Sequence, residues 1–206
     1  MTAYDAVVLA GGEARRLAGA DKALIDLGGR TALDRVLDSV ADAASVVAVG
    51  PPRPGTRPGL EWCREDPPGG GPARALAAAV ERLRQPSVVV LGVDCPLVTR
   101  GTVRRLLISL GSGAPTPPAA CTAGAGPDAV VLVDAQGRDQ PLVAAYRLEA
   151  LRRSGGHRSM RSLLAGLRVL RLPDDEGVTL DCDTWADVEA VRRRLATEEG
   201  SCSTSG

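Results

Sequence analysis

The stretch Ala6-Val-Val-Leu-Ala-Gly-Gly-Glu-Ala-Arg-Arg-Leu-Ala-Gly-Ala-Asp-Lys22 decides the fold. Its first five residues form a short, continuous apolar run, which is typical of a strand that is buried on both faces. Gly11 and Gly12 follow at once, and because they lack a Cβ the backbone there can approach a ligand closely. A buried strand that runs into a glycine loop indicates an α/β protein that binds its ligand at the end of the strand.

The basic residues of the same loop indicate phosphate binding. Lysine and arginine together number 25, and Lys22 is the only lysine among them. Its ammonium group is a compact point charge, whereas a guanidinium is a planar fork, and a point charge suits a site packed around phosphate oxygens. Arg15 and Arg16 add cations. Because Leu17 stands where a P-loop needs glycine, the loop is not a P-loop, and it also lacks the G-x-G-x-x-G of dinucleotide sites. The alternative is a strand-to-helix turn with solvated arginines.

The rest of the first half repeats the alternation of strand and helix. Residues 45–49 and 87–91 are apolar runs that predict buried strands, and helical patterns begin near residues 31 and 72. This order favours a parallel sheet with right-handed crossovers. Asp94 follows the strand at 87–91, so it is expected at the same edge of the sheet as the glycine loop.

Three aspartates are candidate site residues. Asp94, with Pro96 fixing the chain beyond it, is placed to hold Mg²⁺, which usually takes one or two carboxylates and substrate phosphates. The alternative is a cap on the helix that follows. Asp183 is open between a second metal ligand and a cap on the last helix. Asp66 is open between a hydrogen-bond acceptor for a base or ribose and a turn residue.

Composition excludes several other classes of protein. The net charge is zero and aromatic residues make up 2% of the chain, so neither nucleic acid nor an anionic membrane is expected as a partner. The one histidine, His157, excludes a two-histidine zinc motif and is predicted to be a loop residue. The five cysteines lack C-x-x-C spacing, which argues against a disulfide framework, and Cys95 is predicted to be a small buried residue.

The length of 206 residues fits one domain, which we place at 1–196, with a polar tail at 197–206 that is predicted to be disordered. No apolar run reaches the roughly 20 residues of a membrane-spanning helix. No charged leader precedes an apolar stretch, so a cytoplasmic location is expected.

Several motifs together resemble a known family, the MobA-like nucleotidyltransferases, and most of all its molybdenum cofactor guanylyltransferase branch. The resemblance begins with Leu9-Ala-Gly-Gly12, Arg15-Arg16-Leu17 and Asp21-Lys22-Ala-Leu24 and extends from about Ala6 to about Leu195. The later pieces follow in the family's order: Asp66, Gly71-Pro72, Val93-Asp94-Cys-Pro96, Gln140-Pro141-Leu142 and Asp183-Thr184.

The resemblance implies a three-layer α/β/α, Rossmann-like nucleotidyltransferase domain with a mostly parallel sheet. It implies transfer of GMP from Mg-GTP to the phosphate of molybdopterin, with release of pyrophosphate and with Mg²⁺ as cofactor. Transient docking to molybdoenzymes or their chaperones is a further implication.

Residue roles carry over from the family position by position. Arg16 and Lys22 would hold phosphates and, with Asp94, form the catalytic set; Asp94 and Asp183 would bind metal. The nucleotide-binding residues would be Leu9, Ala10, Gly11, Gly12, Lys22, Asp66 and Asp94.

The motifs favour guanine over cytosine, because Leu9-Ala-Gly-Gly12 and Gly71-Pro72 resemble the guanylyl form. The chain departs from the family at Gly50, where asparagine is common, and at Ala73-Arg74. These departures leave the base and the acceptor open. The alternatives are a cytidylyl-, sugar-phosphate or phospholactate nucleotidylyltransferase of the same fold, or a nucleotide-binding domain without catalysis.

Overall fold

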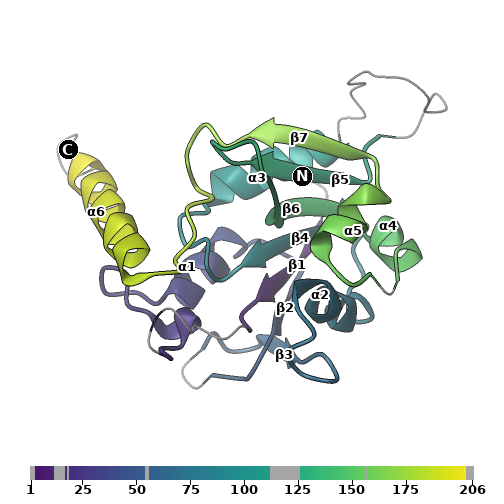
Figure 1. Ribbon diagram of the computed structural model, residues 1–206, viewed down its shortest axis with the longest axis horizontal. Helices are drawn as coiled ribbons and strands as arrows, with labels where there is room; N and C mark the ends of the chain where they lie inside the picture. Colours follow the sequence, from purple (N-terminus) through teal and green to yellow (C-terminus); the bar gives the residue numbers. More distant parts are fainter. Residues whose placement is uncertain are drawn as a thin grey trace.

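The computed structural model describes residues 3–11, 17, 19–53, 56–111, 126–155 and 157–202. Its centre is a seven-stranded sheet with the order β3-β2-β1-β4-β6-β5-β7 (Figure 1). Neighbouring strands are parallel except that β6 runs antiparallel to both β4 and β5. The strands are β1 (Tyr4–Leu9), β2 (Ser45–Val49), β3 (Glu61–Cys63), β4 (Ser87–Gly92), β5 (Ala129–Val133), β6 (Asp139–Arg147) and β7 (Val169–Pro173).

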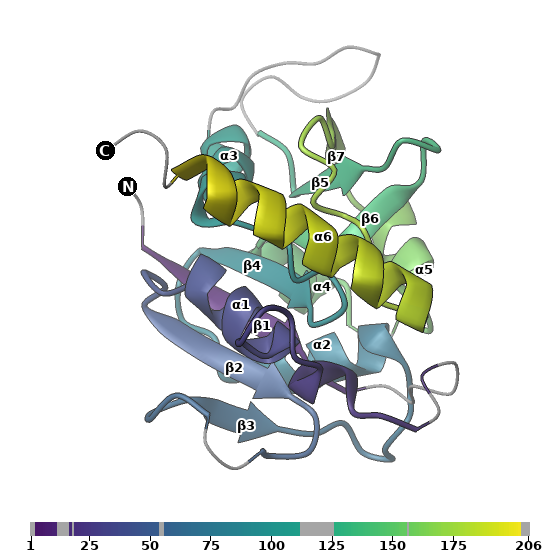
Figure 2. The ribbon, with the colours of Figure 1, turned by 90° about the vertical axis from the view of Figure 1, so that its left-hand side faces the viewer.

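Helices cover both faces of this sheet and complete three layers (Figures 1 and 2). One face packs against α1 (Ala32–Ser39), α3 (Arg100–Gly111) and α6 (Trp185–Cys202). The other packs against α2 (Pro72–Val80), α4 (Leu148–Arg153) and α5 (Met160–Ala165). The predicted three-layer α/β/α class with a mostly parallel sheet is confirmed.

The packing of β1 explains its continuous apolar sequence. Ala6 and Val8 belong to the core on the α1 side, and Val7 and Leu9 belong to the core on the α2 side. Since side chains alternate between the two faces of a strand, both sets must be apolar when helices cover both faces. The same reasoning predicts the strands at 45–49 and 87–91, which the structure confirms as β2 and β4 within one residue at either end.

The register of the central strands brings the two predicted halves of the site together. β1 and β4 are parallel neighbours, with Leu9 opposite Gly92, and the Val93 amide donates to the Leu9 carbonyl at 3.1 Å. The glycine loop and Asp94 therefore leave the sheet side by side. The order of the strands reverses at this pair, which is the position where open α/β sheets bind ligands.

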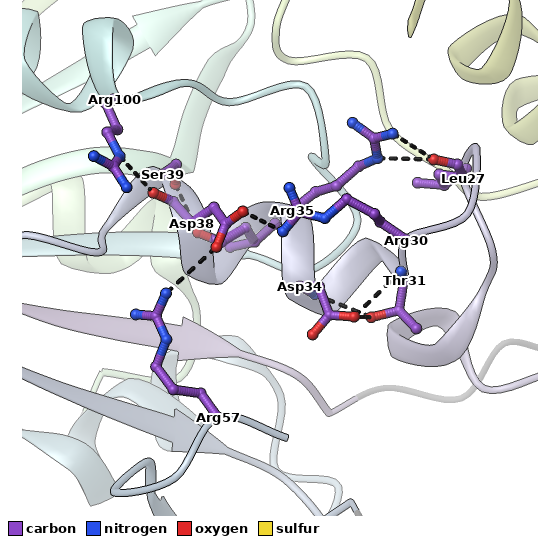
Figure 3. A network of polar contacts seen from close by, with 10 residues as sticks. Leu27, Arg30, Thr31, Asp34, Arg35, Asp38, Ser39, Arg57 and Arg100 are labelled. Atoms are coloured by element: carbon purple, nitrogen blue, oxygen red, sulfur yellow. Dashed lines mark hydrogen bonds and ion pairs between the residues drawn. The ribbon is translucent and has the colours of Figure 1, made fainter. Parts of the chain in front are cut away.

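A polar network anchors the segment that follows Lys22 to α1 (Figure 3). Thr31 caps α1, since its hydroxyl accepts from the Asp34 amide at 3.0 Å while the Asp34 carboxylate accepts from the Thr31 amide at 3.4 Å. This reciprocal pair is a capping box with Asp in place of the more usual Glu. Arg35 donates twice to the Leu27 carbonyl, at 2.8 and 2.6 Å. The segment that follows Lys22 is therefore held to α1.

The last helix begins with a second reciprocal cap. The Thr184 amide donates to the Asp187 carboxylate at 2.7 Å, and the Thr184 hydroxyl accepts from the Asp187 amide at 3.3 Å. α6 runs to Cys202, beyond residue 196 where we end the domain, and that division of the chain stays a prediction. Over the part of the chain that the structure describes, no helix combines the length and the apolar character needed to cross a membrane.

Candidate active site

A cleft of about 1100 Å³ lies at the carboxyl ends of β1 and β4. It is large enough for an organic ligand with several charged groups. Backbone from both the glycine loop and the Gly50 turn forms one wall; a Cβ built on Gly50 would lie 2.9 Å from the Gly11 nitrogen. Gly50 also has a φ of +146°, so the close approach of the two loops depends on glycine there.

Lys22 opens a single turn of 3-10 helix, η2 (Lys22–Leu24), on one side of the cleft. The Asp21 carboxylate caps the turn by accepting from the Ala23 amide at 3.1 Å. Lys22 Nζ donates to Asp183 Oδ1. Burial disfavours the ammonium, but this hydrogen bond and the charges of Asp94, Asp183 and Asp181 together raise the pKa of Lys22 above its usual value. Lys22 is therefore a fixed positive charge.

Asp94 lines the same cleft as Lys22, and the charges of the two residues act on each other. Burial and the neighbouring Asp181 raise the pKa of Asp94, and Lys22 partly offsets this rise. Gly92 makes room for the carboxylate, because a Cβ built there would lie only 2.2 Å from Asp94 Oδ1. Asp94 does not cap α3; Thr99 does so instead, since its hydroxyl accepts from the Thr102 amide at 3.1 Å.

Asp94 forms a compact cluster with Cys95 and Asp181, whose candidate ligand atoms all lie within 4.8 Å of one another. Cys95 Sγ donates to Asp181 Oδ1 at 3.3 Å. Burial, Asp94 and Asp181 raise the pKa of the Cys95 thiol well above its usual value, so it stays protonated and is a poor nucleophile. Asp181 lies in the cluster with Asp94, whereas Asp183 accepts from Lys22 and its charge helps to raise the pKa of Asp94. The role of Asp183 as a second metal ligand stays a prediction. Asp183 does not cap α6, because Thr184 and Asp187 do.

Arg53 also lines the cleft, although no sequence pattern predicts it as a site residue. Its guanidinium donates two hydrogen bonds to the Asp21 carboxylate, at 2.7 and 2.8 Å. It also donates to the Ala10 carbonyl at 2.8 Å. The same group lies 5.7 Å from the centre of the Trp62 ring. The hydrogen bond to Arg53 is the main reason why the pKa of Asp21 is lowered. Arg53 thus links Ala10, which follows β1, to Asp21, which precedes Lys22.

This combination of a glycine loop, a buried lysine and an aspartate cluster at the β1/β4 edge agrees with a comparison to family models. Residues 6–195 match the MobA-like NTP transferase domain. The chain belongs to this family. The matched range holds Lys22, Asp94 and Asp181, and it confirms the resemblance that the motifs carry.

The curated relatives match a shorter stretch of this chain than the model of the MobA-like family does. The chain is similar to the molybdenum cofactor guanylyltransferase of Shewanella sp. (strain MR-4), with 31% identity over 110 residues. The alignment covers 52% of this chain and 56% of that relative, so it spans only about half of the curated relatives' length.

Two solved structures show the same fold. Molybdopterin-guanine dinucleotide biosynthesis protein A from Archaeoglobus fulgidus superposes with a TM-score of 0.71 at 22% identity, covering 94% of this chain and 99% of that one. The 2-C-methyl-D-erythritol 4-phosphate cytidylyltransferase from Thermus thermophilus gives a TM-score of 0.63 at 20% identity, covering 94% and 98%. At these identities the likeness concerns the fold alone.

Four of the nine predicted site residues line the cleft of this MobA-like domain. Leu9, Gly11, Lys22 and Asp94 line it, and Ala10 adjoins it through the hydrogen bond from Arg53 to its carbonyl. Asp66 is exposed and, among the described residues, is not one of those that line the cleft, although Glu65 and Pro68 are. Gly12 and Arg16 lie outside the described residues.

Replacing Arg53 with alanine is expected to lower the free energy of unfolding by about 2 kcal/mol, mainly because the Ala10 carbonyl loses its donor in a buried place. The Asp21 side chain is 38% exposed, so water replaces much of its lost ion pair. Urea denaturation measures the change. Arg57→Ala is the matched control, because Arg57 pairs only at the surface, with Asp38 at 3.4 Å; an equal loss in both variants would contradict the role of Arg53.

Proposed function

We propose that this chain is a nucleotidyltransferase that moves GMP from Mg-GTP to the phosphate of molybdopterin and releases pyrophosphate. The observation that carries the proposal is the convergence of Lys22 and Asp94 on one cleft at the ends of adjacent parallel strands. A fixed ammonium near a carboxylate cluster suits a ligand whose phosphates bind both a cationic side chain and a metal ion. Arg16 stays part of the proposal as a further phosphate ligand, and Gly12 as a backbone contact.

The residues at Asp94 fit a magnesium ion. Mg²⁺ prefers oxygen ligands, and Asp94 and Asp181 offer two carboxylates within one compact cluster. Asp181 supplies the second carboxylate in this proposal, and Asp183, which accepts a hydrogen bond from Lys22, remains a further candidate ligand. Bound there, the ion would neutralise charge on the phosphates and on the departing pyrophosphate.

The reaction needs positioning and charge neutralisation more than proton transfer. An oxygen of the acceptor phosphate attacks the α-phosphorus of GTP and forms a new P–O bond. The bond from the α-phosphorus to the bridging oxygen breaks, and its electron pair leaves with pyrophosphate. Lys22 stabilises the charge that gathers on the phosphates, and the glycine loop lets backbone amides approach them. No covalent intermediate is required, which agrees with the protonated state of Cys95.

Guanine is the base that the relatives favour, since the curated relative is a guanylyltransferase. A cytidylyltransferase is the second candidate, because a cytidylyltransferase is among the solved structures of similar fold. The motifs Leu9-Ala-Gly-Gly12 and Gly71-Pro72 support the guanylyl form, and Gly71 and Pro72 both line the cleft.

Pyrophosphate release from GTP and from CTP distinguishes the two candidates. With molybdopterin and Mg²⁺ present, GTP is expected to react at least about tenfold faster than CTP, since a site built to hydrogen-bond one base rejects another that leaves its polar groups unpaired. A coupled assay for pyrophosphate measures both rates. Release with CTP but not GTP would overturn the guanylyl assignment, and release with neither would favour a non-catalytic binding domain.

A further inference from the structure

Three segments of the cleft wall meet at one buried side chain, that of Arg53. Its guanidinium donates four hydrogen bonds, two to the Asp21 carboxylate, one to the Ala10 carbonyl and one to the Pro51 carbonyl. Ala10 follows β1, Pro51 comes after β2, and Asp21 precedes η2. A planar guanidinium can hold several acceptors at fixed angles, which an ammonium cannot do. Arg53 therefore sets how these three segments lie relative to one another.

Arg53 lines the cleft, but its guanidinium is already engaged by the protein itself. Its side chain is only 7% exposed, and the centre of the Trp62 ring lies 5.7 Å from the guanidinium carbon. Its hydrogen bonds use four of the five N–H groups that an arginine side chain offers. A phosphate group would have to displace these acceptors to bind there. Any effect of Arg53 on a ligand must therefore pass through the groups that it holds.

The first of these groups is the Asp21 carboxylate. Asp21 Oδ1 accepts from Arg53 Nη2 at 2.8 Å and also from the Ala23 amide at 3.1 Å, and the second bond caps η2. A single turn of 3-10 helix has few hydrogen bonds of its own, so its position depends on this cap and on the burial of Ala23. Through Asp21, Arg53 fixes the turn from which the Lys22 side chain extends.

The second group is the Ala10 carbonyl, which belongs to the peptide that joins Ala10 to Gly11. The carbonyl and the N–H of a trans peptide point in opposite directions, so a carbonyl held by Arg53 directs the Gly11 amide away from the guanidinium. Gly11 lines the cleft, and within the described ranges its amide has no hydrogen-bond partner. A backbone N–H at a binding cleft can donate to an anionic oxygen. Arg53 thus also orients a free donor of the glycine loop.

We propose that Arg53 is a positioning residue that places two phosphate-binding groups, the Lys22 ammonium and the Gly11 amide, before the nucleotide binds. This inference rests on the proposed function, in which Lys22 and the glycine loop contact the triphosphate. Groups that are already in place stabilise charge without reorganising during the reaction, and a displacement of about 1 Å can cost on the order of a hundredfold in rate. Arg53 lowers the barrier without touching the substrate.

A double-mutant cycle between Arg53 and Lys22 tests this inference. Arg53→Met keeps an unbranched stem beside Trp62 but removes every donor, and it is expected to lower kcat/KM for GTP at least about tenfold. In a Lys22→Ala background the same change is expected to cost no more than about threefold, because only the effect through Gly11 remains. Steady-state pyrophosphate release measures all four proteins at a temperature where circular dichroism shows each one to be folded.

Chemical labelling of Lys22 gives a second measurement that does not depend on turnover. Lys22 is the only lysine, so acetylation of its ε-amino group is read by mass from a single peptide. Its side chain is 19% exposed, and release of η2 in Arg53→Met is expected to make labelling several-fold faster. Asp21→Asn is a milder second variant with the same expected direction, because its side-chain oxygen can still cap η2 while its amide nitrogen opposes the donors of Arg53.

Arg57→Met is the matched control for both measurements. Arg57 comes from the same loop as Arg53 and pairs only at the surface, with Asp38 at 3.4 Å. Its replacement is expected to change kcat/KM and the labelling rate of Lys22 by less than about twofold.

The outcomes separate this inference from the proposed function. If Arg53→Met costs the same factor with and without Lys22, or stays within about twofold of the unaltered chain, the inference is wrong and the proposed function stands. Unchanged labelling of Lys22 in Arg53→Met, or in Asp21→Asn should the first variant not fold, overturns the inference as well. If the unaltered chain releases no pyrophosphate from GTP, the proposed function fails, and the labelling rates alone decide whether Arg53 positions Lys22.

Discussion

Replacing Lys22 with alanine is expected to lower kcat/KM for GTP by about a hundredfold or more, the usual scale for removing a positioned group that stabilises developing charge. The Lys22 ammonium is partly buried, with its side chain 19% exposed, and its pKa is raised by the surrounding aspartates. In this environment water replaces the lost charge poorly. Steady-state pyrophosphate release at varied GTP concentration measures the effect.

Two companion variants make the result for Lys22 specific. Lys22→Arg keeps the charge but replaces a compact ammonium with a planar fork, and we expect it to recover less than about a tenth of the lost activity. Arg104→Ala removes an exposed cation from α3 and is expected to leave the rate unchanged. Turnover of Lys22→Ala within a few-fold of the unaltered chain would show that the ammonium does not act on the phosphates.

Replacing Asp94 with alanine is expected to cost a similar factor, about a hundredfold or more, because the cluster loses one of its two carboxylates. Asp94 is the residue that both lines the cleft and belongs to the cluster with Cys95 and Asp181. The rate should also respond less steeply to Mg²⁺ concentration than in the unaltered chain. Pyrophosphate release across a magnesium titration measures both changes.

Gly92→Ala tests the position of Asp94 without removing the carboxylate. A Cβ at residue 92 would lie 2.2 Å from Asp94 Oδ1, so the carboxylate must move aside. Displacement of a catalytic group by about 1 Å can cost on the order of a hundredfold, and we expect a loss approaching that of Asp94→Ala. Full activity in Gly92→Ala, with an unchanged melting temperature, would contradict the requirement for Asp94 in its observed place.

The sequence predicts the fold well because burial of a strand requires apolar residues, which are visible as a run in the sequence. Strands covered on both faces are apolar in their central residues, and the runs that become β1, β2 and β4 follow this rule, although β1 also buries Asp5 near its start. Helix starts are equally legible, because Thr31 and Thr184 each cap a helix together with an aspartate three residues later. Both features involve residues that are close together in the sequence, so the sequence alone predicts them.

The site is predictable only where one residue type stands out. Lys22 is the only lysine of the chain and Asp94 lies two residues beyond β4, so both stand out in the sequence, and the structure brings them to one cleft. Arg53 is one of the 24 arginines of the chain and lies in a loop rich in proline and glycine, where no sequence pattern distinguishes it. The choice between Asp181 and Asp183 likewise depends on where a distant lysine lies. Such contacts are set by tertiary packing, which spacing along the chain does not encode.

A crystal structure with Mg²⁺ and α,β-methylene GTP tests most directly whether Lys22 and Asp94 act on one triphosphate. Lys22 Nζ is expected to leave Asp183 and contact the phosphates, with density for a metal ion bonded to Asp94 and to the same phosphate chain. A triphosphate that lies away from either residue, or a metal ion held elsewhere than at Asp94, would contradict the assignment of this cleft.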